Sequence, residues 1–131
     1  MTSLSGKTLL IVDDEALIRD AIAYDFSKLG CKILEADGGN TALDMLLSHR
    51  IDVVISDIIM PDGDGIKLLE KMLGYPDRDK PIVIMITGGA TLTKEEASKK
   101  GVNAIVSKPF RPHELLNTVI SQFDRVNGPP I

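Results

Sequence analysis

The chain has 131 residues, which fits one domain with a substantial core and is too short for two. Apolar residues make up 44% and charged residues 26%, so disordered and fibrous classes are excluded. The net charge of −4 and the scattered lysines argue against nucleic-acid binding, and no apolar run approaches the ~20 residues of a membrane span. We therefore expect a globular domain that binds neither nucleic acid nor membrane. Its expected location is the cytoplasm, because no signal peptide precedes Lys7.

The first predicted strand is the apolar run of residues 8–12, which stops abruptly at the acidic segment 13–15. Apolar residues then recur at helical spacing over residues 17–29, which predicts a helix. Residues 32–36 alternate polar and apolar side chains, as an edge strand does. A second helical stripe follows over residues 42–47. The chain thus begins with two strand–helix units, the first of them joined by acids.

The third predicted strand, residues 53–57, reads as buried on both faces and ends at Asp57, because Pro61 prevents its continuation. After a turn, the inward stripe of a third helix is Ile66, Leu69, Met72 and Leu73. The fourth predicted strand, residues 82–86, is also wholly apolar and stops at Thr87. A polar side chain therefore stands at the carboxyl end of each of these two strands.

The last third of the chain carries two clear helix starts. Thr93 and Glu96 have the spacing of a capping box and predict a helix with a thin apolar face. Its exposed residues are Lys94, Lys99 and Lys100. A short fifth strand, residues 103–107, ends at Lys108, and Pro112 suits the first position of a final helix.

Five strands alternating with five helices predict an α/β fold, a doubly wound parallel sheet with right-handed crossovers. The strands at 8–12, 53–57 and 82–86 are unbroken apolar runs and should be central, whereas those at 32–36 and 103–107 are mixed and should be edges. That difference predicts the strand order 2-1-3-4-5. In such sheets a ligand binds beyond the carboxyl ends of the strands, between strands 1 and 3.

This order brings together Asp13, Asp14 and Asp57, three carboxylates whose repulsion a divalent cation would relieve. All-oxygen ligands suit Mg²⁺, or Mn²⁺, and Mg²⁺ commonly shares a phosphate. On the neighbouring strands, the Thr87 hydroxyl and the Lys108 ammonium are suited to phosphoryl oxygens. An aspartate between a metal and a lysine is a nucleophile for phosphoryl transfer, and Asp57, the central one, is the expected acceptor.

The motifs at these strand ends are Asp13-Asp14, Asp57 with Met60-Pro61, Thr87, and Lys108-Pro109-Phe110. In this combination the chain resembles the receiver domains of two-component response regulators, the group with the flavodoxin/CheY-like fold. The resemblance covers residues 7–126 as one phosphoacceptor domain. Residues 1–6 and 127–131 are then expected to be flexible ends.

The resemblance implies that a sensor histidine kinase or a histidine phosphotransfer protein donates a phosphoryl group to Asp57. It implies that Asp14, Asp57 and the backbone carbonyl of Ile59 hold Mg²⁺, with Asp13 acting through water. It further implies that Thr87 and Lys108 contact the phosphoryl group and that the Lys108-Pro109 bond is cis. Such a domain is a phosphoacceptor that catalyses its own phosphorylation and dephosphorylation rather than an enzyme with a separate substrate.

The resemblance also implies an output surface made by the fourth helix, the fifth strand and the fifth helix, where phosphorylation changes the packing and an output partner binds. We expect a monomer or a weak dimer. Two positions depart from the family pattern: Ile105 stands where an aromatic switch residue is common, and Gly63 replaces a methionine. Ile59 is apolar and is expected to shield the acceptor from attacking water, so we predict a moderately long-lived phosphoaspartate.

Three alternatives to a phosphorylated receiver are open at this point. The first is an adaptor or scaffold that keeps the fold and is never phosphorylated, although such domains usually lack one of the key groups. The second is a phosphatase of the haloacid-dehalogenase-like kind, which forms a phosphoaspartate. That family has an Asp-x-Asp motif after strand 1, whereas Asp13 and Asp14 are adjacent here. The third is a nucleotide-binding protein, which would need a phosphate loop where this chain has acids. The single cysteine, Cys31, is assigned no role.

Overall fold

A computed structural model describes residues 4–58, 60, 65–74, 80–88 and 93–128 of the chain. Strands and helices alternate along these residues, as predicted. The elements are β1 (Thr8–Val12), α1 (Ala16–Ser27), β2 (Lys32–Ala36), α2 (Gly39–Ser48), β3 (Val53–Asp57), α3 (Gly65–Leu73), β4 (Ile82–Thr87), α4 (Lys94–Lys99), β5 (Ala104–Ser107) and α5 (Pro112–Asn127).

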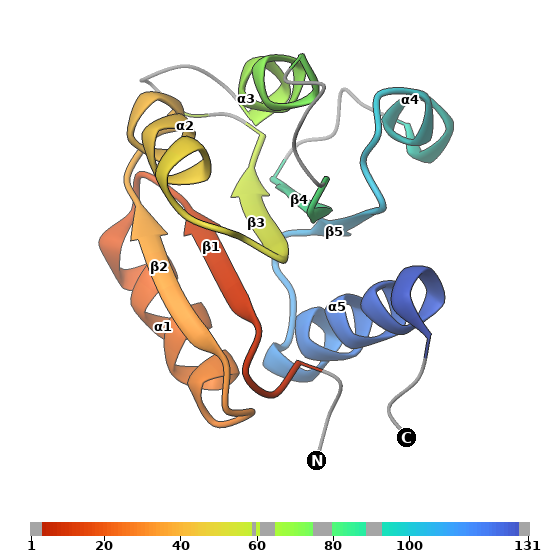
Figure 1. The fold of residues 1–131 in the computed structure, drawn as a ribbon. Helices are drawn as coiled ribbons and strands as arrows, with labels where there is room; N and C mark the ends of the chain where they lie inside the picture. Colours follow the sequence, from red (N-terminus) through yellow and green to blue (C-terminus); the bar gives the residue numbers. More distant parts are fainter. Residues whose placement is uncertain (1–3, 59, 61–64, 75–79, 89–92, 129–131) are drawn as a thin grey trace.

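The five strands form one parallel sheet in the order β2-β1-β3-β4-β5, which confirms the predicted order (Figure 1). The register sets the strand ends side by side. Val12 of β1 pairs with Ser56 of β3, and Asp57 pairs with Ile86 of β4. Thr87 pairs with Ser107 of β5. The carboxyl ends of β1, β3, β4 and β5 therefore lie side by side at one edge of the sheet.

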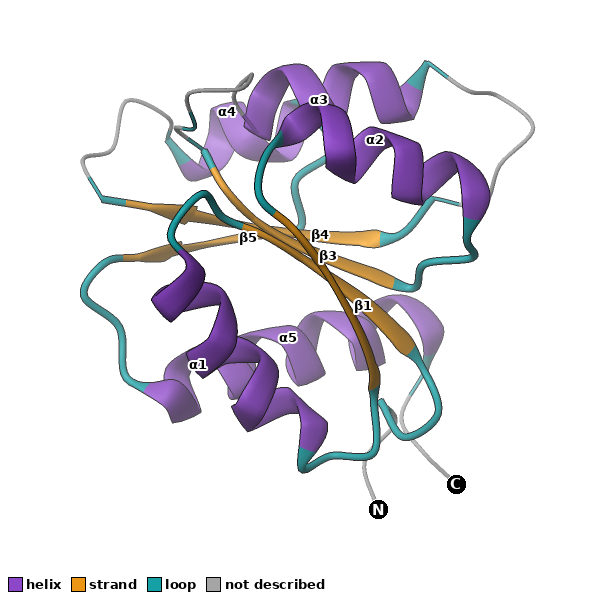
Figure 2. Ribbon diagram, turned by 90° about the vertical axis from the view of Figure 1, so that its left-hand side faces the viewer, coloured by secondary structure: helices purple, strands orange, loops and turns teal. Residues whose placement is uncertain are grey.

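Helices cover both faces of the sheet: α1 and α5 lie on one side, and α2, α3 and α4 on the other (Figure 2). Successive side chains of a strand point to opposite faces of the sheet, so alternate residues pack in two separate hydrophobic cores. In β1, Leu9 and Ile11 pack with α1 and α5, whereas Leu10 and Val12 pack with the other helices. All residues of β3 and β4 are buried, and β2 and β5 are mixed, as their sequences predicted.

Helix α4 begins at the predicted capping box. The Glu96 amide donates to Thr93 Oγ1 at 3.1 Å, and the Thr93 amide donates to Glu96 Oε1 at 3.4 Å. A helix cap of this kind stabilises by about 1 kcal/mol. Among the side chains of α4 that the structure describes, only Ala97 is buried, so the predicted thin apolar face is confirmed.

In two helices, α1 and α3, the residues that are buried differ from the apolar stripe predicted from the sequence. Leu17 belongs to the predicted apolar stripe of α1 yet is 84% exposed. Its neighbour Ile18 packs against the core, so Leu17 lies about 100° around the helix axis from the buried face, and Ala21 in the next turn is exposed as well. In α3, Leu68 is buried although the predicted stripe omitted it, while Leu73 at the predicted position is 36% exposed. None of the described helices has the length and apolar character needed to cross a bilayer.

Candidate phosphoacceptor site

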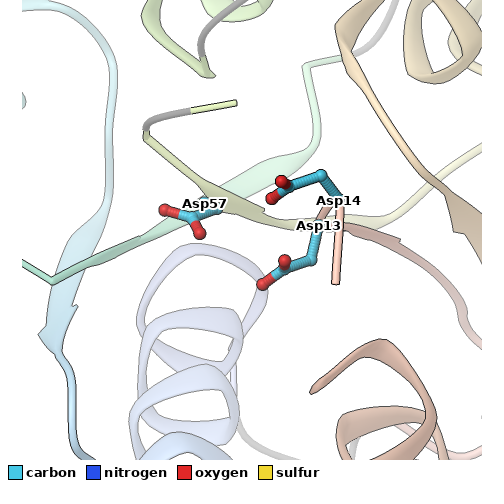
Figure 3. A group of neighbouring side chains, drawn as sticks. All are labelled: Asp13, Asp14 and Asp57. Carbon is cyan, nitrogen blue, oxygen red and sulfur yellow. The ribbon is translucent and has the colours of Figure 1, made fainter. Parts of the chain in front are cut away.

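Three carboxylates from the ends of β1 and β3 form a cluster at the carboxyl edge of the sheet (Figure 3). Asp13, Asp14 and Asp57 each offer one oxygen, and these oxygens lie within 4.8 Å of one another. Asp13 and Asp57 are buried, whereas Asp14 is exposed. The structure thus brings together the three acids that the sequence predicted as a group.

Asp13 is held in a fixed orientation. Its backbone amide donates to the carbonyl of Ala36 at 3.1 Å, and its Oδ1 accepts the Glu15 amide at 2.8 Å. Its Oδ2 is buried and has no hydrogen-bond partner among the described residues. Burial raises the pKa of Asp13 above its ordinary value, although the Glu15 amide and the charge of Lys108 oppose that rise. An ionised Asp13 therefore needs a cation that the protein itself does not fully supply.

Lys108 supplies part of that charge. Its Nζ donates to Asp57 Oδ2 at 2.8 Å and lies 3.8 Å from Asp13 Oδ2. Burial works against the charged form of Lys108, but the hydrogen bond to Asp57 and the charges of Asp57, Asp13 and Glu15 raise its pKa overall. The side chain is therefore a permanent cation at neutral pH. The predicted cis bond between Lys108 and Pro109 is present.

Thr87 ends β4 one residue beyond the pairing partner of Asp57 and is buried. Its carbonyl accepts the backbone amide of Lys108 at 2.7 Å, so these two predicted phosphate-binding residues are tied together through the main chain. The predicted metal ligand at Ile59 lies outside the described residues, as does Gly63.

Gly65 contributes to the site although the sequence analysis gave it no role. Its amide donates to the carbonyl of Ile58 at 2.7 Å, and a Cβ placed on it would lie 2.5 Å from the backbone oxygen of Asp57. Only glycine permits the start of α3 to approach Asp57 so closely. The sequence signal was a glycine eight residues after an aspartate, which has no meaning without the fold.

The donor set fits a hard divalent cation. All three side chains offer carboxylate oxygens, no histidine or cysteine belongs to the cluster, and one buried oxygen of Asp13 lacks a hydrogen bond among the described residues. These are the features of a site for Mg²⁺ or Mn²⁺ rather than zinc.

Comparison with known proteins gives a consistent result. Residues 9–120 match the response regulator receiver domain. The chain is 38% identical over 122 residues to the chemotaxis protein CheY of Pseudomonas aeruginosa, covering 92% of this chain and 98% of that protein. It is 33% identical over 116 residues to the phosphate regulon transcriptional regulatory protein PhoB of the same organism, covering 85% of this chain and 49% of PhoB. The chain therefore spans nearly all of one relative and about half of the other.

Solved structures of receiver domains superpose on this fold. A CheY-like response regulator receiver domain protein from Methanospirillum hungatei superposes with a TM-score of 0.82 at 28% identity, covering 92% of this chain and 96% of that one. The response regulator protein TrrA from Thermotoga maritima, solved in complex with Mg²⁺ and BeF, gives a TM-score of 0.77 at 28% identity, covering 88% and 98%.

The doubly wound sheet with an acidic cluster at its carboxyl edge defines a phosphoacceptor class of α/β domain. The chain belongs to the response regulator receiver domain family of two-component signalling, which confirms the resemblance and the fold predicted from sequence. Receiver domains bind Mg²⁺ through such a cluster and interact with histidine kinases and output domains. The adaptor alternative is not favoured, because the phosphoacceptor cluster is intact.

Proposed function

We propose that this protein is a switch in which Asp57 accepts a phosphoryl group from the histidine of a sensor kinase or of a histidine phosphotransfer protein. The observation that carries the proposal is the position of Asp57, which hydrogen-bonds Lys108 at 2.8 Å on one side and faces Asp13 and Asp14 on the other. A carboxylate oxygen of Asp57 forms the bond to phosphorus while the phosphorus–nitrogen bond of the donor breaks. The imidazole that leaves takes a proton from solvent.

Asp57 is better placed to accept the group than its neighbours. Asp13 is only 1% exposed and uses one oxygen to accept the Glu15 amide. Asp14 is exposed, and none of the ion pairs among the described residues joins it to Lys108. Of the three acids, Asp57 combines a direct hydrogen bond to Lys108 with an exposure of 7%, which is more than Asp13 has. A phosphoryl group on Asp57 would thus carry its negative charge between the Lys108 ammonium and the proposed site of the divalent cation.

Mg²⁺, when bound, supplies positive charge that offsets the repulsion between the carboxylates and an incoming phosphoryl group. Asp14, Asp57 and the carbonyl of Ile59 are the proposed direct ligands, and Asp13 would act through water. Lys108 holds a phosphoryl oxygen with its ammonium, and the Thr87 hydroxyl donates to another. With these groups the domain would promote its own phosphorylation and also its dephosphorylation, in which water hydrolyses the phosphoaspartate and inorganic phosphate leaves.

We place the output surface on α4, β5 and α5. Ile105 of β5 is partly buried on the side of the sheet that α4 covers, and α4 buries only Ala97 among its described side chains. Movement of Thr87 and Lys108 toward the phosphoryl group would pull on β4 and β5 and so shift this face. The partner on that face is an output domain or protein. We propose a receiver unit over residues 7–126, a cytoplasmic location and a monomer or weak dimer.

The test is phosphorylation by acetyl phosphate with Mg²⁺, followed by intact-mass analysis. Wild type should gain about 80 Da, the mass of one added phosphoryl group. Asp57→Asn should gain nothing, while the surface control Asp44→Asn should behave as wild type. A wild-type protein that gains no mass with acetyl phosphate or with a phosphorylated histidine donor would refute the proposal, as would an undiminished adduct in Asp57→Asn.

A further inference from the structure

Arg19 of α1 connects the acidic loop to the edge of the sheet. Its Nη1 donates to the backbone carbonyl of Asp13 at 2.7 Å, and its Nε lies 3.4 Å from Glu35 Oε1 of β2. The Arg19 side chain is 18% exposed and that of Glu35 is 37% exposed. One guanidinium thus links the residue that precedes Asp14 to a strand on the far side of β1.

The fold explains why these residues meet. In β2, Ile33 packs in the core under α1 and α5, and Leu34 packs on the opposite face. Glu35 therefore points to the same face as Ile33, toward α1. Arg19 lies in the first turns of α1, above the carboxyl end of β2, where its long side chain spans the gap.

The contact completes the fixation of Asp13. Its amide donates to Ala36, and its Oδ1 accepts the amide of Glu15. With Arg19 on the carbonyl, Asp13 Oδ2 is the one hydrogen-bonding atom of this residue that lacks a hydrogen bond among the described residues. The peptide between Asp13 and Asp14 is then held by a charged donor. The orientation of this peptide sets the backbone positions from which the side chains of Asp13 and Asp14 extend.

We propose that Arg19, anchored by Glu35, is a positioning residue that acts through the Asp13 carbonyl and thereby sets the affinity of the acidic cluster for a divalent cation. This inference rests on the proposed function of the cluster. Arg19 does not itself touch the cation or the phosphoryl group. Groups that orient metal ligands typically change metal affinity by about 10- to 100-fold when they are removed.

The sign of the effect separates positioning from simple electrostatics. Arg19 is a cation beside a cation site, so the removal of its charge alone would strengthen Mg²⁺ binding. The loss of a positioned carbonyl and carboxylate would weaken it. If a variant that lacks the Arg19 charge binds Mg²⁺ more weakly, the loss is therefore due to the changed orientation of the Asp13 backbone and not to the change in charge.

The experiment compares Mg²⁺ binding to the whole chain by isothermal titration calorimetry, because the protein has no tryptophan to report the metal. Arg19→Met should weaken Mg²⁺ binding about tenfold. Arg19→Lys, which keeps one donor, should recover part of the loss. Arg125→Met removes the same charge from an exposed site at the end of α5 and should leave binding unchanged. Equal or tighter binding by a folded Arg19→Met would overturn the inference.

Amide hydrogen exchange in EDTA tests the same inference without metal. In Arg19→Met the amide of Glu15, which donates to Asp13 Oδ1, should exchange faster, while amides in the centre of β3 keep their protection. Glu35→Gln should produce the same local change and serves if Arg19→Met does not fold. Unchanged Glu15 exchange in both variants would contradict the inference. If wild type binds no Mg²⁺, the proposed function fails, while this comparison still decides whether Arg19 positions the loop.

Discussion

The ammonium of Lys108 lies 2.8 Å from Asp57 Oδ2, across a separation of 51 residues in the sequence. The two residues follow β5 and end β3, so β4 lies between their strands. The contact offsets the negative charge of a buried carboxylate that faces two further acids. It also means that a phosphoryl group on Asp57 meets a cation already in place.

Replacement of Lys108 by methionine should slow phosphorylation of Asp57 about 100-fold, because a positioned donor to the reacting group is lost. The rate with acetyl phosphate is followed by intact mass at fixed Mg²⁺ concentration. Lys99→Met is the matched control, since Lys99 is exposed and pairs only loosely with Glu95 at 3.8 Å. Equal rates in Lys108→Met and Lys99→Met would contradict the assigned role.

Asp13→Asn should stabilise the protein in EDTA at pH 7. The pKa of Asp13 is raised by burial, so its neutral form favours folding at low pH and that contribution is lost as the pH rises through the folded-state pKa. Asparagine keeps an acceptor for the Glu15 amide but carries no charge. The expected gain is about 1 kcal/mol in the free energy of unfolding, measured by urea denaturation.

The pH and metal dependence of Asp13→Asn provide its controls. The gain should shrink as the pH falls toward 3.8, where the unfolded carboxyl also becomes protonated. Mg²⁺ should stabilise wild type more than the variant, because ligand binding to the folded state adds stability. A variant that is less stable than wild type at pH 7 in EDTA would show that the charge of Asp13 is already compensated.

Gly65→Ala should destabilise the domain by about 2 kcal/mol or more, because the new methyl would lie 2.5 Å from the backbone oxygen of Asp57. Phosphorylation of Asp57 should slow as well, since the end of β3 has to shift. Gly88→Ala is the control for stability: among the described residues its Cβ would meet only Lys108 Cδ, at an ordinary 3.7 Å. Urea denaturation of both variants measures the difference, and equal stability would rule out the steric argument.

Cys31 should react slowly with iodoacetamide. It is half-buried, and burial raises the pKa of its thiol above the ordinary value of 9.0, so less thiolate is present at a given pH. The alkylation rate at pH 8 is compared in native protein and in protein unfolded by urea. Faster unfolded-state alkylation is expected, whereas equal rates would show that the fold does not protect the thiol.

The strand order and the acidic cluster were predictable because both depend on strong local signals. Unbroken apolar strands indicated central positions, and polar residues at strand ends had to meet once the order was known. The contact between Arg19 and Asp13 was not predictable in this way, because it depends on the reach of a long side chain across a loop. Leu17 shows a second limit: the apolar stripe of α1 is wider than the face that is buried, and the sequence does not show which side of the stripe meets the sheet.

Among the described side chains of helix α4, that of Ala97 is the only one buried in the interior, and the capping contacts of the helix join its own residues. Its outward residues can therefore change without disturbing either core. Duplicated copies of such a gene could acquire new output partners by substitutions on this helix while the chemistry at Asp57 is inherited intact. Signalling routes would then diverge through substitutions on the surface of the fold, which change the free energy of unfolding little.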